Sequence, residues 1–214
     1  MRRIWLVSVC LLFIQVQSHA QTDELEKFEV GAEFTTLSRR DYYGLRGEPG
    51  FGGRFTYNLN KNVALETSGY FFPRRCFVCE SNGSITEVVG GIKAGKRFKT
   101  FGLFAKARPG VVSFSRGQVD ALFSTPPPNT FFQLEYSRLT HFATDVGGVV
   151  EFYPSRKIVA RFDAGDTIVY MRQRTSNGLA FVGSSPNSYV PVPLITPGKT
   201  THDFQFSASV GFRF

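Results

Sequence analysis

The sequence predicts an all-β protein: an eight-stranded antiparallel up-and-down transmembrane β-barrel preceded by a cleavable signal peptide. Three observations favour it. Apolar and polar residues alternate with a period of two in eight segments, long connections alternate with short ones, and nearly all strand charges share one face. A disordered chain is excluded because 15% of the 214 residues are aromatic. A helical membrane protein is excluded because the one long apolar run, residues 4–16, is too short to span a bilayer.

The first twenty residues have the pattern of a signal peptide. Arg2 and Arg3 precede an apolar run, and Ser18 and Ala20 supply the small residues that signal peptidase requires. We therefore expect residues 1–20 to be removed before Gln21, which leaves one exported barrel domain over residues 21–214.

The first five segments after the signal peptide each carry one mainly apolar face. Because successive side chains of a strand point to opposite sides, each segment is predicted to be a strand. Their apolar faces are Phe28, Val30, Ala32 and Phe34; Phe51, Gly53, Phe55 and Tyr57; Val63, Leu65, Thr67, Gly69 and Phe71; Val88, Gly90, Ile92 and Ala94; and Phe101, Leu103, Ala105 and Ala107.

The last three segments continue the alternation, and the eighth is the most regular of all. Between its apolar residues stand only polar or small ones, from Asp203 to Arg213. The three apolar faces are Phe142, Val146, Val150 and Phe152; Ile158, Ala160, Phe162 and Ala164; and Phe204, Phe206, Ala208, Val210, Phe212 and Phe214.

The connections between the predicted strands alternate in length. Long stretches at about 38–50, 73–86, 115–140 and 171–200 carry the prolines, including Pro126–Pro128, Pro191, Pro193 and Pro197. Tight turns lie around Asn60–Asn62, Lys99–Thr100 and Pro154–Arg156. Outer-membrane barrels have short periplasmic turns and longer external loops. We therefore expect the cell outer membrane, with extracellular loops and both mature termini in the periplasm.

The polar face carries acids and bases in similar numbers, while the apolar face is almost free of charge, apart from Lys96 and Asp166. A charge on the lipid face at the bilayer midplane costs about 2–4 kcal/mol. We therefore predict an interior network of ion pairs, and Lys27, Asp203 and Arg213 share its face. Its predicted members are Glu29, Glu33, Arg54, Glu66, Lys93, Arg97, Lys106, Arg108, Asp145, Glu151, Arg161 and Asp163.

The C-terminal segment resembles the assembly signal of outer-membrane barrels, which ends on an aromatic residue and alternates apolar residues before it. The signal residues are Phe206, Val210, Phe212 and Phe214. Segments 52–59 and 93–98 are also similar to strands of the small OmpA-like outer-membrane barrel family. The resemblance implies a barrel recognised by the outer-membrane assembly machinery, and it covers the barrel alone, so binding to the cell wall is not implied. We expect a monomer.

Two cysteines, Cys76 and Cys79, lie in the second long connection. In an oxidising exterior a small loop disulfide is the favoured interpretation. Redox exchange and metal capture are the alternatives, although a zinc site lacks a second pair of ligands.

Three residues at the loop ends of the last strands are candidates for a catalytic group: His141, Asp166 and His202. Their parity argues against it, because His141 shares the interior face with Asp145 whereas His202 shares the lipid face with Phe204. We therefore predict no catalysis, no cofactor and no metal.

The long connections are net basic, which suits contact with outer-membrane lipids and lipopolysaccharide phosphates. The basic residues are Arg39, Arg40, Arg46, Arg74, Arg75, Arg116, Arg138, Arg172, Arg174 and Lys199, against Asp41, Glu48, Glu80, Asp120 and Glu135. A merely solvated loop surface is the alternative. Nucleic-acid binding is not expected of an exported chain without a recognition motif, despite its isoelectric point of 9.6.

The predicted function is a structural, envelope-integrity or surface-interaction role with a closed interior, because eight strands leave a lumen that side chains fill. Two alternatives remain. One is a lipid A-modifying outer-membrane enzyme. The other is a periplasmic lipocalin-like carrier, in which the same alternation would face the other way and enclose an apolar ligand.

Overall fold

The computed structural model describes residues 26–41, 44–73, 83–124, 131–181 and 189–214. They form ten strands: β1 (Phe28–Asp41), β2 (Gly44–Asn58), β3 (Val63–Phe72), β4 (Ile85–Arg97), β5 (Phe101–Ser124), β6 (Phe131–Phe152), β7 (Ile158–Met171), β8 (Arg174–Phe181), β9 (Tyr189–Thr196) and β10 (Lys199–Arg213). The predicted signal peptide lies outside the described residues. No helix within those ranges is long and apolar enough to cross a membrane.

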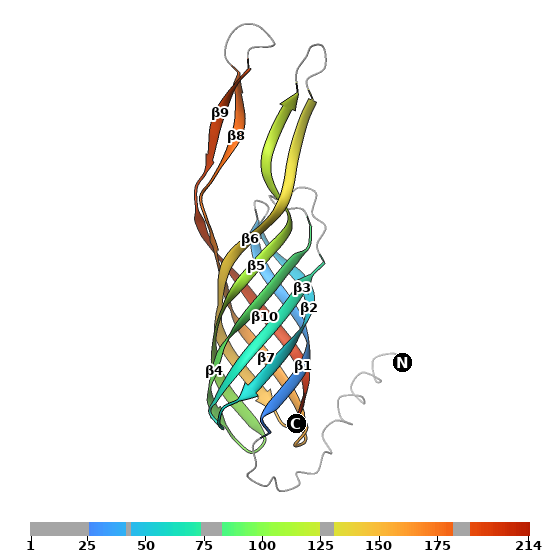
Figure 1. The fold of residues 1–214 in the computed structure, drawn as a ribbon. Helices are drawn as coiled ribbons and strands as arrows, with labels where there is room; N and C mark the ends of the chain where they lie inside the picture. The colour runs from blue at the N-terminus through green and yellow to red at the C-terminus, as the bar shows by residue number, and fades with distance from the viewer. Residues whose placement is uncertain (1–25, 42–43, 74–82, 125–130, 182–188) are drawn as a thin grey trace, which may run out of the picture.

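Eight of the strands close into an antiparallel up-and-down barrel in the order β1-β10-β7-β6-β5-β4-β3-β2 (Figure 1). The barrel closes where β1 pairs with β10, from Glu29 opposite Arg213 to Ser38 opposite Phe204. The predicted all-β class and the predicted eight-stranded antiparallel up-and-down barrel are therefore confirmed.

The long connections contain more strand than the sequence indicated. The predicted loop at 115–140 is largely the continuation of β5 and β6, and the one at 171–200 contains the separate hairpin β8–β9. The first predicted loop, 38–50, is mostly the continuation of β1 and β2. In Figure 1, two hairpins stand beyond the barrel at the end opposite the tight turns. These segments show no period of two because a hairpin beyond the closed barrel has no face that must be apolar throughout.

Two details explain how these hairpins leave the barrel. The register of β5 against β6 shifts between Phe114 and Gly117 and again between Gln118 and Asp120, and such bulges bend a strand. Pro191 and Pro193, which were predicted to lie in a loop, belong to β9. A two-stranded sheet tolerates them because one edge of each strand needs no partner. The run Pro126–Pro128 lies outside the described residues.

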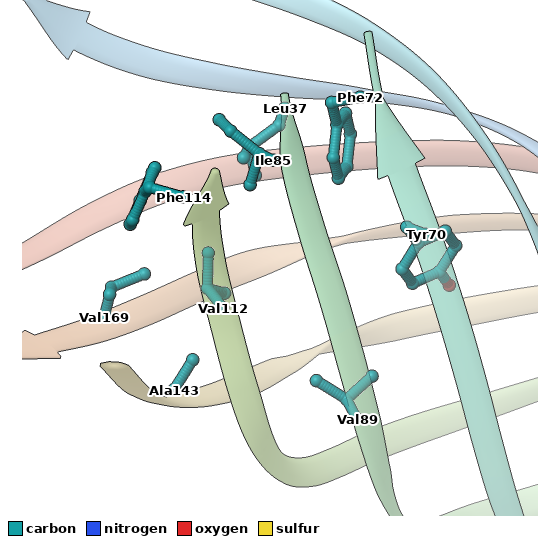
Figure 2. Close-up of a cluster of buried hydrophobic side chains, with 9 residues drawn as sticks. All are labelled: Leu37, Tyr70, Phe72, Ile85, Val89, Val112, Phe114, Ala143 and Val169. Carbon is teal, nitrogen blue, oxygen red and sulfur yellow. The ribbon is translucent and has the colours of Figure 1, made fainter. Parts of the chain in front are cut away.

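Inside the barrel, the loop-side end is filled by apolar side chains (Figure 2). The cluster is drawn from β1, β3, β4, β5, β6 and β7, and Met171 packs against it. Its members are Leu37, Tyr70, Phe72, Ile85, Val89, Val112, Phe114, Ala143 and Val169. We call this set the apolar plug. The alternation of residues in the sequence predicts a charged lumen and does not predict the apolar plug.

Candidate functional site

The strand pattern places the charged side chains in the lumen. Along β10 every second residue from Asp203 to Arg213 is buried, while Phe204, Phe206 and Phe212 are exposed. This orientation is the reverse of a lipocalin-like carrier, whose apolar faces line a cavity. The carrier alternative is therefore wrong for this chain.

All twelve residues of the predicted network point inward. Arg97, at the turn side, is half-buried, and the other eleven are buried. Lys27, assigned to the same face from its parity, is instead exposed, because it precedes β1 and so stands outside the barrel wall.

Glu66 on β3 is the centre of the network. Its carboxylate accepts a hydrogen bond of 2.6 Å from Arg108 Nη1 and one of 2.8 Å from Arg161 Nη2, and Arg161 Nη1 binds its second oxygen. Lys93 Nζ lies 3.9 Å and Arg54 Nη1 4.0 Å from the same carboxylate. Four cations from four strands therefore converge on one buried acid.

Each of the two central arginines also binds a second carboxylate. Arg108 Nε donates to Asp145 Oδ2 at 2.8 Å, and its Nη1 donates to the hydroxyl of Ser68 at 2.9 Å. Arg161 binds Asp163 through Nε and Nη2, both at 2.8 Å. Such two-point contacts are stronger and more directional than single ones, so they fix both guanidinium groups.

The remaining cations near the centre are paired as well. Lys106 Nζ lies 3.0 Å from Asp145 and 3.3 Å from Asp163, and Lys93 forms a hydrogen bond with Glu151. The network therefore reaches across the lumen from β3 to β7, and its side chains fill the space that a conduit would need.

Nearer the turn side, Arg54 Nη2 donates to Glu29 Oε1 at 2.6 Å, and its Nε lies 3.6 Å from Glu33. Arg97 Nε donates to the hydroxyl of Tyr153 at 3.1 Å, and that hydroxyl donates to Glu151 at 2.8 Å. Burial, with the Glu151 carboxylate beside it, raises the pKa of Tyr153, so the hydroxyl keeps the proton that it donates.

Arg39 extends the network at the loop side, where its Nε lies 3.1 Å from Asp203. From the sequence, Arg39 is predicted to lie on a basic loop surface. This was wrong because β1 continues past residue 38 and keeps its parity, so the side chain turns toward the lumen. Arg138 and Arg172 are exposed, as expected of a surface.

Glu87 on β4 was missed altogether. It is fully buried, neither carboxylate oxygen has a hydrogen-bond partner, and its neighbours along the inner face are Ile85 and Val89 of the apolar plug. Across the sheet it faces Tyr70 and Val112. It has the parity of Lys93, so extending the fourth predicted strand by one residue would have found it.

We expect Glu87→Leu to raise the free energy of unfolding by about 1–3 kcal/mol, because it removes a buried polar group without a partner and fills its place with an apolar one. Equilibrium urea unfolding in lipid vesicles, followed by far-UV circular dichroism, measures the change. A loss of stability would show that the carboxyl group has a structural role in the plug.

The outer wall is apolar between two bands of aromatic rings. At the loop side Phe51 packs on Phe71 with ring centroids 5.7 Å apart, and Phe142 stacks on Tyr170 at 5.6 Å. In the turn-side band Phe98 stacks on Phe101, with ring centroids 4.6 Å apart. The members of this band are Phe28, Tyr57, Phe98, Phe101, Phe212 and Phe214. The predicted assembly-signal residues, Phe206, Val210, Phe212 and Phe214, are all exposed on this wall.

His202 and Asp166 form a pair on the outer wall, with His202 Nδ1 2.6 Å from Asp166 Oδ2. His141 lies apart from them. It has the inward parity of Ala143 and contacts the ring of Phe114. The structure confirms the predicted separation of His141 from His202. The contact between His202 and Asp166 was not predicted. The antiparallel register of β7 and β10 brings the two residues together.

Cys76 and Cys79 lie outside the described residues. Elsewhere in the described chain, no group of three or more His, Cys, Asp or Glu residues is placed to hold a metal ion.

The comparisons with known proteins bear on the fold alone. No family model and no curated protein matches the sequence. Among solved structures, neisserial surface protein A is 12% identical with a TM-score of 0.51, over 87% of this chain and 97% of that one. Ail of Yersinia pestis is 12% identical with a TM-score of 0.48, over 89% and 100%. The N-terminal barrel domain of Pseudomonas aeruginosa OprF is 14% identical with a TM-score of 0.39, over 86% and 97%. The closed eight-stranded barrel and the likeness to neisserial surface protein A show that the chain has the fold of a small eight-stranded outer-membrane β-barrel.

Proposed function

We propose that this chain is an OmpA-like barrel protein of the cell outer membrane of a diderm bacterium, with a structural, envelope-integrity or surface-interaction role. One observation carries the proposal: the apolar rows face outward between two aromatic bands, while acids and bases pair inside. Lipid selects this orientation because charge on the outer wall is costly at the bilayer midplane. Closure of the sheet satisfies the backbone hydrogen bonds that lipid cannot satisfy.

The ion-paired lumen and the apolar plug support a closed barrel rather than a pore. Glu66 binds cations on both sides of the lumen, and the plug fills the loop-side end. Interaction is therefore assigned to the outer wall and to the two hairpins that stand beyond the barrel.

The proposal includes the parts that follow from outer-membrane location. Residues 1–20 direct export, the assembly machinery recognises the C-terminal strand, and the protein is a monomer. The hairpins are extracellular and both mature termini are periplasmic. The exposed arginines at the loop side, Arg138 and Arg172, are available to outer-membrane lipids and lipopolysaccharide phosphates.

Heat-modifiable mobility tests the proposal. The membrane fraction is run in SDS with and without boiling, and the folded protein is separately floated with lipid vesicles. A membrane barrel resists cold SDS, shifts on boiling and floats. Recovery in the soluble fraction after osmotic release, with no shift on boiling, would contradict the proposal.

The His202–Asp166 pair favours a second candidate function, a lipid A-modifying enzyme. A carboxylate on Nδ1 leaves Nε2 of the imidazole free to exchange a proton with a lipid, and the pair stands on the wall that lipid would contact. This candidate is tested by the mass of lipid A after expression. A mass shift that His202→Ala abolishes would establish it, and an unchanged mass would remove it.

A further inference from the structure

The turn-side end of the barrel carries a ring of basic side chains. Six exposed cations lie at the start of β1 and on the three tight turns or the strand ends beside them, and the one carboxylate side chain described near them on the outside is the half-buried Glu26. We call this set the basic ring: Lys27, Lys61, Lys96, Lys99, Arg156 and Lys157.

The interior carboxylates nearest the basic ring pair with cations inside the lumen. Interior carboxylates nearest this end are already engaged, Glu29 with Arg54 and Glu151 with Lys93. They are also buried within the wall. The ring therefore presents a net positive charge to whatever surrounds this end of the barrel.

The ring follows the circumference of the barrel. Lys27 precedes β1, Lys61 lies between β2 and β3, Lys99 between β4 and β5, and Arg156 between β6 and β7. In the closed order of the strands the start of β1 and these three turns are distributed around the whole barrel, and Figure 1 shows the turns together at the end where the chain terminates. A partner that meets every one of them must surround the barrel, as a lipid leaflet does.

Two lysines of the ring place it at the edge of the apolar wall. Lys96 Nζ lies 5.5 Å from the ring centroid of Phe98, and Lys157 Nζ lies 5.9 Å from that of Phe212. Both phenylalanines belong to the turn-side aromatic band and are 40% and 49% exposed. Aromatic bands mark the boundary between hydrocarbon and headgroups, and a lysine stem can lie along apolar surface while its ammonium reaches the headgroups.

We propose that the basic ring binds the phosphates of anionic phospholipids in the leaflet that surrounds the turn-side end. This inference rests on the proposed membrane location and adds to it the lipid class and the residues that select it. Among the described side chains, six exposed cations stand against the one carboxylate of Glu26. This favours a headgroup with net negative charge over a zwitterionic one, because surface lysines and arginines are attracted to anionic lipid within a Debye length.

The test uses the full protein reconstituted in phosphatidylcholine bilayers that contain a minor fraction of phosphatidylglycerol. Electron paramagnetic resonance of spin-labelled lipids measures the association of phosphatidylglycerol with the barrel relative to phosphatidylcholine. We expect the wild type to prefer phosphatidylglycerol by about fivefold at low salt. The preference should fall toward unity in high salt and in the variant Lys96→Gln/Lys99→Gln/Lys157→Gln.

The matched control removes the same charge from the hairpins at the other end, through Arg46→Gln/Arg116→Gln/Arg138→Gln, and should keep the preference. Equal loss in both variants would assign the effect to overall charge and overturn the inference. A wild type without preference for phosphatidylglycerol would also overturn the inference. The same holds if the protein binds soluble polyglutamate but not phosphatidylglycerol vesicles.

Two further measurements keep the outcome interpretable. If the variant Lys96→Gln/Lys99→Gln/Lys157→Gln does not fold, the salt dependence of the wild type tests the inference. A preference for phosphatidylglycerol that does not fall in high salt would contradict it. Flotation and heat-modifiable mobility report membrane insertion separately, so a barrel that floats without lipid preference contradicts this inference and leaves the proposed function standing.

Discussion

Replacing Glu66 by leucine is expected to lower the free energy of unfolding by about 3–5 kcal/mol, the usual effect of breaking a buried ion pair by removing one partner. Arg108 would lose Glu66 and keep Asp145, and Arg161 would lose Glu66 and keep Asp163 at 2.8 Å and Glu151 at 3.7 Å. Both guanidinium groups are fully buried, so water cannot replace the lost partner.

The Glu87→Leu variant is the matched control for this substitution. Both positions are inward-facing glutamates on neighbouring strands, 2% and 0% exposed, and only Glu66 has cations bound to it. The same chemical change is therefore expected to destabilise at Glu66 and stabilise at Glu87. Urea unfolding in vesicles measures both. Equal effects would mean that burial of the side chain, and not its pairing, determines stability.

A double-mutant cycle separates the pair energy from the effect of leaving a charge alone. The variant Glu66→Leu/Arg161→Leu removes both members of one pair and is expected to recover part of the loss, because an apolar pair of similar size often replaces a buried ion pair at little cost. No recovery would indicate that Arg108 carries most of the unpaired charge.

The faces of the strands could be predicted because the lumen and the lipid impose opposite demands on alternate residues. A period of two is sufficient to place Glu29 and Arg161 inside and Phe34 and Phe162 outside, wherever a strand crosses the bilayer. The same reasoning located eight strands and the tight turns between them.

The pattern does not extend to segments beyond the closed barrel. Both faces of the β8–β9 hairpin lie outside the barrel sheet, so no alternation signals a strand there, and its prolines suggested a loop. Arg39 was misplaced for a related reason, because the boundary of β1 was set where the apolar signal ends and not where pairing with β2 ends.

Partners across the lumen could not be predicted from parity. Parity shows that Glu66 and Arg161 both point inward, but their contact depends on the stagger of the closed sheet, which brings together residues 95 positions apart. The apolar plug was missed because Leu37, Ile85 and Val112 have the parity of the charged face, and an all-charged lumen was the simpler expectation.

The outward orientation of the apolar rows leads to the second large effect: Val210→Arg is expected to lower the free energy of unfolding in a bilayer by about 2 kcal/mol. Val210 lies one lipid-facing position inward from Phe212 of the turn-side aromatic band, so the cost of its charge falls between the about 2–4 kcal/mol of the midplane and the about 0–1 kcal/mol of the interface. Val210 is 62% exposed and stands on β10 between Ala32 of β1 and Ala160 of β7. Because no bulky neighbour is displaced, the expected loss of stability comes mainly from removing the arginine charge from water.

Thr200→Arg supplies the control on the same strand and the same face. Thr200 is exposed and pairs with Tyr170 of the loop-side aromatic band, where the cost of a charge falls to about 0–1 kcal/mol. Refolding both purified variants from urea into vesicles, without assembly factors, separates lipid exposure from recognition of the C-terminal strand. At an exposed position of a water-soluble barrel, arginine would be nearly neutral. Equal stability of the Val210→Arg and Thr200→Arg variants would therefore place the Val210 face in water and remove the physical basis of the membrane assignment.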